Sequence, residues 1–366
     1  MIPAKHVIWA MILAGAAGAA AAPPPPLTNM WQAASAAART GGLNGHLVVA
    51  DSQSNYGEDI GKPGKTGQFW RWASVTKQIV AVLVMQQVDA GTVALDTPIK
   101  AYVPQLPVTN ADRITLRQLL AHTSGLPNAQ DGPMNAAGTE LALLDRSTPR
   151  PAPTIDARGI NAVCTGAAKA APGERFEYNN CDTQVAGAVL EAVTGKTLRQ
   201  LLRAQLFKPL KMDGARLLQA GDAAGRTGYF ADGSNDDFID VGRYGAAAAI
   251  AGPPAALVKF DQALLAGRLM SAAARTEMWN GKAELGFSAL GQWAYTVPLA
   301  GCTGPVDLVE RRGSIGGVEV RNVIAPKLGR ILIAFADRPA EFGEPWQGKG
   351  LTYDLLSAAF CAPSKS

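Results

Sequence analysis

The stretch Ser74-Val75-Thr76-Lys77 opens a long apolar run that continues to Asp89 and is followed by Gly91. Apolar residues recur at nearly every turn of this run: Val75, Ile79, Val80, Val82, Leu83, Val84, Met85 and Val88. This pattern predicts a helix that is buried on most sides, with Gly91 at its C-terminal end. Residues three apart share a helix face, so we expect the Lys77 ammonium beside the Ser74 hydroxyl. The free N–H groups and the positive dipole end of this helix would favour an oxyanion, which makes Ser74 a candidate nucleophile.

A second candidate segment, Tyr178-Asn179-Asn180, lies just before another predicted helix. A phenol can take the Ser74 proton if a neighbouring ammonium, here that of Lys77, stabilises the phenolate. Asn180 would then hold Lys77 and a substrate amide or carbonyl group in place. The alternative is a tyrosine that packs against the helix start and only satisfies its hydroxyl group.

The third candidate segment is Arg311-Arg312-Gly313-Ser314, at the edge of a predicted strand. Arg311 could hold a substrate carboxylate, Gly313 would let the strand approach the substrate, and the Ser314 N–H could complete an oxyanion hole with the N–H of Ser74. The alternative is a solvated strand edge guarded by charge. A register shift of one residue exchanges the two faces of a strand, so the sequence does not distinguish which arginine lines a cleft.

Together these three segments resemble the class C β-lactamase-like serine hydrolases, which include class C β-lactamases, D-Ala-D-Ala carboxypeptidases, D-aminopeptidases and family VIII esterases. The run from Ile114 to Pro127 is similar to the linker signature of this family. Further similar segments are Ala186-Gly187, Thr194-Gly195-Lys196 and Leu206-Phe207-Lys208-Pro209-Leu210. The resemblance implies an acyl-enzyme on Ser74, with Lys77 and Tyr178 sharing the proton transfer. It also implies a small-molecule or peptide acyl substrate, and a D-amino-acid peptide and a β-lactam are among the candidates.

One departure from the family pattern affects the expected substrate. The family usually has Lys-Thr-Gly or His-x-Gly where this chain has Arg311-Arg312-Gly313. Arginine keeps the positive charge and gains bidentate geometry toward a carboxylate, but it is bulkier and rigidly planar. We therefore expect an esterase or a peptidase rather than an efficient β-lactamase. A different class of function, a non-catalytic protein that binds the cell envelope or peptidoglycan in the same cleft, is the alternative.

The start of the chain predicts export. Lys5 and His6 precede an apolar run from Val7 to Leu13 and small residues up to Ala22, which is typical of a signal peptide over 1–22. A proline-rich spacer is expected over 23–30. We thus expect a periplasmic or secreted protein that has no stable membrane anchor after processing and could contact the cell envelope. The net charge of +4 comes without a basic cluster, so no nucleic-acid partner is expected.

Four cysteines, Cys164, Cys181, Cys302 and Cys361, predict two disulfides in an exported chain. Three pairings are open, and we favour the most local one, Cys164 with Cys181 and Cys302 with Cys361. The chain has no CxxC motif, and His46 and His122 are interpreted as structural residues. No metal and no other cofactor is expected.

Strand patterns occur at both ends of the chain and helix patterns between them. Strands are expected over 45–50, 285–298, 306–312, 318–325 and 330–336. Helices are expected over 116–122, from a cap at Asp182 to Gly195, over 255–266 and over 351–360. These elements predict one antiparallel sheet built from both chain ends and flanked by helices, with an inserted helical domain. This is the β-lactamase/transpeptidase-like fold class, an α/β domain (31–90 and 285–366) with a mainly helical domain (91–284).

Overall fold

The computed structural model describes residues 27–62, 69–128 and 162–361. The predicted signal peptide lies outside these residues. So does most of the segment from Asn128 to Pro153, whose richness in Gly, Pro, Ala and Asp predicts a long surface excursion. Helix α1 (Leu27–Thr40) begins inside the expected spacer 23–30, so the last four residues of that spacer are helical.

The main sheet joins the two ends of the chain. Its strand order is β2-β1-β10-β9-β8-β7-β6, and each neighbouring pair is antiparallel. The strands are β1 (Gly45–Asp51), β2 (Asn55–Ile60), β6 (Ser288–Ala289), β7 (Gln292–Val297), β8 (Val306–Ile315), β9 (Val318–Ala325) and β10 (Arg330–Ala336). Strand β1 pairs with β10 from Gly45 opposite Ala336 to Asp51 opposite Arg330. The expected sheet from both chain ends is therefore confirmed.

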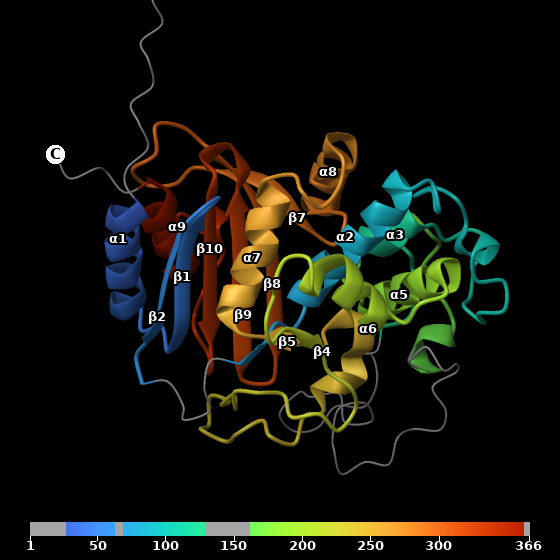
Figure 1. The fold of residues 1–366 in the computed structure, drawn as a ribbon, viewed down its shortest axis with the longest axis horizontal. Coiled ribbons are helices and arrows are strands. Elements are labelled where there is room, and N and C mark those ends of the chain that lie inside the picture. The colour runs from blue at the N-terminus through green and yellow to red at the C-terminus, as the bar shows by residue number, and fades with distance from the viewer. Residues whose placement is uncertain (1–26, 63–68, 129–161, 362–366) are drawn as a thin grey trace, which may run out of the picture.

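Helices cover both faces of this sheet (Figure 1). Alternate side chains of β1 enter different cores: Val48 packs with α2 (Val75–Asp89) and α7 (Pro254–Leu265), whereas Leu47 packs with α1 and α9 (Leu351–Cys361). Because both faces are buried, the central strands lack an alternation of apolar and polar residues, and every residue of β10 is buried.

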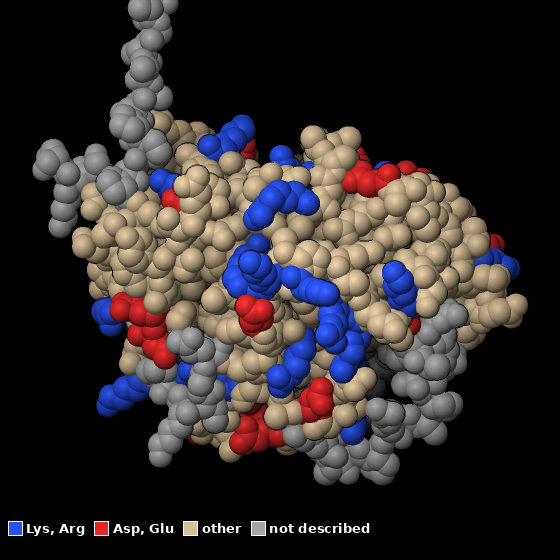
Figure 2. Space-filling view, in the orientation of Figure 1, with Lys and Arg blue, Asp and Glu red and all other residues tan. Residues whose placement is uncertain are grey.

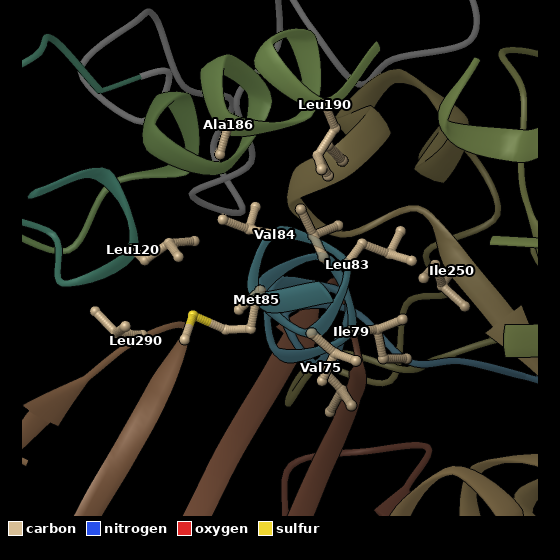
Figure 3. Packing of buried hydrophobic residues seen from close by; sticks show 14 of the residues in the cluster. Val75, Ile79, Leu83, Val84, Met85, Leu120, Ala186, Leu190, Ile250 and Leu290 are labelled. Atoms are coloured by element: carbon tan, nitrogen blue, oxygen red, sulfur yellow. The ribbon is translucent and has the colours of Figure 1, made fainter. Parts of the chain in front are cut away.

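Helix α2 is the centre of the larger core (Figure 3). Its neighbours include α3 (Leu116–Leu120), α5 (Asn180–Thr194), α8 (Ala272–Met278) and the small sheet β3-β5-β4. That small sheet consists of β3 (Trp70–Arg71), β4 (Arg216–Leu217) and β5 (Ile250–Gly252), and α6 (Leu198–Leu201) lies close by. Apolar side chains surround α2 on all sides, so the prediction of a helix buried on most sides is confirmed, with Ser74 at its N-cap.

Two helices pack across the expected domain boundaries, which stay a prediction. Helix α7 belongs by sequence to the segment 91–284 but packs on β1 and β10 of the main sheet. Helix α2 belongs by sequence to the segment 31–90 but packs against α5 and α8. An amphipathic pattern shows that a helix has a buried face without showing which neighbour covers it.

The start of α5 differs from the prediction. Its N-cap is Asn179, whose side chain accepts a hydrogen bond from the N–H of Cys181 at 2.8 Å. The expectation that Asp182 caps this helix is wrong, because the Asp182 carboxylate instead accepts from Ser124 and contacts His122. Gly195 ends α5 in a left-handed conformation, as predicted. Thr115 and Thr197 form capping boxes at the starts of α3 and α6.

The favoured disulfide pairing is confirmed: Cys164 is bonded to Cys181, and Cys302 to Cys361.

On the face seen in Figure 2, Lys and Arg side chains gather across the middle of the molecule. The fold thus brings together basic residues that are scattered along the sequence. Among the described residues, no helix has the length and apolar character needed to cross a bilayer.

Candidate active site

Ser74 lies at the start of α2, where Tyr178 and Lys77 converge on its side chain. Its Oγ atom is 2.6 Å from the Tyr178 Oη atom and 3.1 Å from the Lys77 Nζ atom. The preceding residue, Ala73, has a φ of 47° in the left-handed region that is costly for a residue with a side chain. The backbone therefore makes a sharp turn from β3 into α2, and this turn presents the Ser74 hydroxyl to Tyr178 and Lys77.

Lys77 is fully buried, and acceptors surround its amine. Its Nζ atom donates to the Ser74 Oγ atom, to the Asn180 Oδ1 atom at 2.7 Å and to the Ala247 carbonyl oxygen at 2.9 Å. These three acceptors match the three N–H bonds of an ammonium group. Burial lowers the pKa of Lys77 to about 8, and the charge of Arg311 acts in the same direction.

Tyr178 precedes α5 and faces two cations. Burial alone would raise the pKa of its phenol, but the charges of Lys77 and Arg311 and the hydrogen bond with Ser74 outweigh burial and bring the pKa to about 8. The Arg311 Nη2 atom donates to the Tyr178 Oη atom at 2.9 Å. A phenolate at Tyr178 could thus accept from Arg311 and from the Ser74 hydroxyl at the same time.

The Arg311 side chain contacts Tyr178 and the backbone of Ser74 and does not line the cavity in front of Ser74. Its side chain is only 1% exposed, and its Nε atom donates to the carbonyl oxygen of Ser74 at 2.9 Å. Its guanidinium carbon lies 4.9 Å from the centre of the Trp293 ring. The guanidinium thus contacts Tyr178 and the backbone of Ser74, and the role of Arg311 in holding a substrate carboxylate stays a prediction.

A cavity of about 300 Å³ opens in front of Ser74. Its lining residues are Ser74, Tyr178, Asn180, Tyr244, Ala248, Trp293, Arg312, Gly313, Ser314, Ile315, Glu319, Val320 and Arg321. Ser74, Tyr178, Asn180, Gly313 and Ser314 are thus brought together as the sequence predicted. Of the two adjacent arginines, Arg312 lines the cavity and Arg311 does not.

Gly313 allows a close approach, but the partner is not the one expected. A Cβ atom at Gly313 would lie 2.7 Å from the Trp72 carbonyl oxygen and 2.9 Å from the Ala73 Cβ atom. The missing side chain therefore lets β8 pack directly against the turn that carries Ser74. Ser314 is exposed at the cavity, one residue further along β8.

Sequence reasoning missed Asn128, which clamps the backbone around Tyr178. Its Nδ2 atom donates to the Tyr178 carbonyl oxygen at 3.1 Å, and its Oδ1 atom accepts from the Asn180 N–H at 3.2 Å. Asn128 directly follows the linker segment that ends at Pro127, but no local pattern indicates a contact with residues some 50 positions away.

Sequence reasoning also missed the buried contacts of His122 with the site. The His122 ring lies 4.7 Å from the Tyr178 ring, and its Nδ1 atom is 2.9 Å from the Asp182 Oδ2 atom. Burial, together with the charges of Arg311 and Lys77, lowers the pKa of His122 well below its usual range. A neutral imidazole adds no third positive charge to the site.

The comparisons with known proteins agree with this fold. Residues 33–344 match the family model described as Beta-lactamase, so the chain belongs to the β-lactamase-like serine hydrolase family. Two curated relatives are the D-alanyl-D-alanine-carboxypeptidase/endopeptidase AmpH of Escherichia coli (strain K12), 32% identical, and the esterase EstB of Burkholderia gladioli, 30% identical. The matched segments cover 45% and 46% of this chain and 43% of each relative, so the chain spans less than half the length of these relatives.

Solved structures show the same fold at lower identity. A D-stereospecific amidohydrolase from Streptomyces sp. is 22% identical with a TM-score of 0.70, over 92% of this chain and 99% of that one. The D-amino acid amidase from Ochrobactrum anthropi SV3 is 22% identical with a TM-score of 0.69, over 90% and 98% of the two chains. The predicted β-lactamase/transpeptidase-like fold is therefore confirmed.

Proposed function

We propose that this protein is an exported serine hydrolase that cleaves an ester or an amide through an acyl-enzyme on Ser74. One observation carries the proposal: the Ser74 Oγ atom is within hydrogen-bond distance of both the Lys77 Nζ atom and the Tyr178 Oη atom. A nucleophile, a base and a cation that stabilises the base are the parts that nucleophilic catalysis requires.

In the proposed reaction the Tyr178 phenolate takes the proton of Ser74 while the Oγ atom bonds to the substrate carbonyl carbon. Lys77 and Arg311 stabilise the phenolate beforehand. The oxyanion accepts from the backbone N–H groups of Ser74 and Ser314, and Tyr178 then protonates the leaving alcohol or amine. Water attacks the resulting ester and gives a proton to the Tyr178 phenolate. Tyr178 passes this proton to the Ser74 Oγ atom as the C–O bond breaks, which releases the acid and restores the Ser74 hydroxyl and the phenolate.

An esterase or peptidase activity fits better than efficient β-lactam hydrolysis. The curated relatives are named as an esterase and as a carboxypeptidase/endopeptidase. Arg311, at the position of the usual family lysine or histidine, is occupied by Tyr178 and Ser74. The two disulfides support export to the periplasm or the medium, since disulfides persist in oxidising compartments.

Intact-mass spectrometry tests the proposal. The protein starting at residue 23 is exposed to a fluorophosphonate and, separately, to a penicillin, with Ser74→Ala as the control. We expect a fluorophosphonate adduct that Ser74→Ala abolishes. A second adduct, with the penicillin, would show that the cleft also accepts a β-lactam, and its rate of decay would measure deacylation. If neither reagent modifies the protein and a peptidoglycan fragment binds reversibly to both variants, the protein is a non-catalytic binder.

A further inference from the structure

The cavity in front of Ser74 contains arginines, yet carboxylates of the protein itself already occupy them. We propose that the substrate group lying along β8 is uncharged, so that the site selects esters and amides without a free carboxylate beside the scissile bond. This inference rests on the proposed function and concerns the same site. It makes Glu344, which pairs with Arg312, a determinant of substrate specificity.

The guanidinium of Arg312 donates hydrogen bonds to two carboxylates of the protein. Its Nε and Nη2 atoms donate to the two carboxylate oxygens of Glu310 at 3.0 and 3.2 Å. Its Nη1 atom donates to Glu344. Glu310 is fully buried and stays where it is, whereas the Glu344 side chain is 27% exposed. These contacts use three of the five N–H donors of the guanidinium, and a substrate carboxylate that binds the Nη1–Nη2 edge has to compete with Glu344 for Nη1.

Two tryptophan rings also lie against the guanidinium of Arg312. Its guanidinium carbon lies 5.2 Å from the ring centre of Trp293 and 5.2 Å from that of Trp346. An arginine that is stacked on aromatic rings and bound by two carboxylates has little freedom to turn toward a ligand. Arg312 therefore serves as part of the cavity wall.

The other charged residues at the outer cavity reinforce this arrangement. Arg321 donates to Glu310 at 3.2 Å and to the Gly343 carbonyl oxygen at 3.3 Å. Glu319 lines the same cavity and would repel an entering carboxylate. Trp293, Ile315 and Val320 supply apolar surface to the rest of the wall, which suits an uncharged group.

A matched pair of thioesters separates the two substrate classes. Benzoylglycyl-mercaptoacetate and benzoylglycyl-mercaptoacetamide carry the same acyl group, and their leaving thiols differ only by a carboxylate. We expect kcat/KM for the amide to exceed that for the carboxylate by about tenfold or more, in line with the usual contribution of one charge-assisted hydrogen bond. Equal values, or a preference for the carboxylate, would overturn the inference. Failure of Ser74→Ala to abolish turnover of either thioester would instead overturn the proposed function.

Glu344→Ala tests directly whether Glu344 keeps substrate carboxylates away from Arg312, because this variant frees the Nη1 atom of Arg312. We expect this variant to shift the ratio of the two kcat/KM values toward the carboxylate by about tenfold. The ratio is measured on one protein sample, so it is independent of the fraction that is folded. Glu341→Ala, on the same loop and exposed, removes the same charge and should leave the ratio unchanged. An equal shift of the ratio in both variants would show a general charge effect and would contradict a specific role for Glu344.

Discussion

The Nη2 atom of Arg311 lies 2.9 Å from the Tyr178 Oη atom, and the Nε atom of the same side chain lies 2.9 Å from the Ser74 carbonyl oxygen. One guanidinium on β8 therefore fixes both the tyrosine and the turn that carries the serine. Its positive charge favours the phenolate, and its planar geometry sets the distance between the sheet and α2. We propose that Arg311 acts through Tyr178 and is a positioning residue.

Arg311→Gln should change the pH dependence of hydrolysis. Burial raises the pKa of Tyr178, but the charge of Lys77 and, after it, that of Arg311 bring this pKa down to about 8, so removing the arginine charge raises it. The acidic limb of kcat/KM for an uncharged ester then moves to higher pH by about one unit, which is about a tenfold loss of rate near pH 7. Rates measured between pH 6 and 10 check this. Arg311→Lys keeps the charge and should retain a limb closer to that of the unsubstituted protein; the same shift in both variants would contradict a role for the charge.

Gly313→Ala should damage the site, because the added Cβ atom meets the backbone of Trp72 and the side chain of Ala73. The turn that carries Ser74 has to move, and we expect kcat to fall about tenfold or more with a loss of about 1–3 kcal/mol in the free energy of unfolding. Gly304→Ala is a suitable control, since a Cβ atom there meets nothing within 4 Å. Unchanged kcat in Gly313→Ala would show that the turn tolerates displacement.

Removing either disulfide should lower the free energy of unfolding, but only one of the two disulfides should also affect kcat. The loop between Cys164 and Cys181 spans 17 residues and that between Cys302 and Cys361 spans 59. Chain entropy predicts losses of about 3 and about 4 kcal/mol in the free energy of unfolding for the two double-serine variants, measured by urea denaturation. Only the first variant should also lower kcat in folded protein, because Cys181 adjoins Asn180 at the start of α5. Equal effects of both variants on kcat would contradict this assignment.

Asp261→Asn should stabilise the protein increasingly as the pH rises. Burial raises the pKa of Asp261 to about 8, although the Asn322 side chain donates to its carboxylate at 3.0 Å. Below the unfolded-state pKa of about 3.9 the carboxyl is protonated in both states and costs nothing. Between pH 4 and 8 only the unfolded state loses the proton, so stability falls as the pH rises toward the folded-state pKa.

We therefore expect the advantage of Asp261→Asn over the unsubstituted protein to grow by at least about 2 kcal/mol from pH 4 to pH 8. Chemical denaturation at both pH values measures this difference. Asp112→Asn, at an exposed position, serves as the comparison and should show a much smaller change. An advantage that is the same at both pH values would show that Asp261 keeps an ordinary pKa.

Periodicity predicted the elements whose surroundings are uniform. Strand β10 is buried throughout and α2 over most of its length, so apolar residues recur often enough in both sequences for their positions to be predicted. The two arginines could not be told apart, since their side chains leave opposite faces of β8 and a shift of one residue exchanges them. The cap of α5 was mispredicted because Asn179 and Asp182 are both good capping residues. The choice depends on His122, which is 60 positions away from Asp182.

The pairing of β1 with β10 has a consequence for the order in which the chain can fold. Residue 45 meets its partner only when residue 336 is available, and β2 reaches the rest of the sheet only through β1. A nascent chain that ends before Arg330 contains Ser74, Lys77 and Tyr178 but lacks β10. Without β10, the hairpin of β1 and β2 cannot pair with the rest of the sheet, because β10 lies between β1 and β9. Contacts so far apart in sequence form slowly, because a long loop has to close before they stabilise anything. Hydrolytic activity should therefore emerge only after nearly the whole polypeptide has been synthesised, and truncated products should remain inactive.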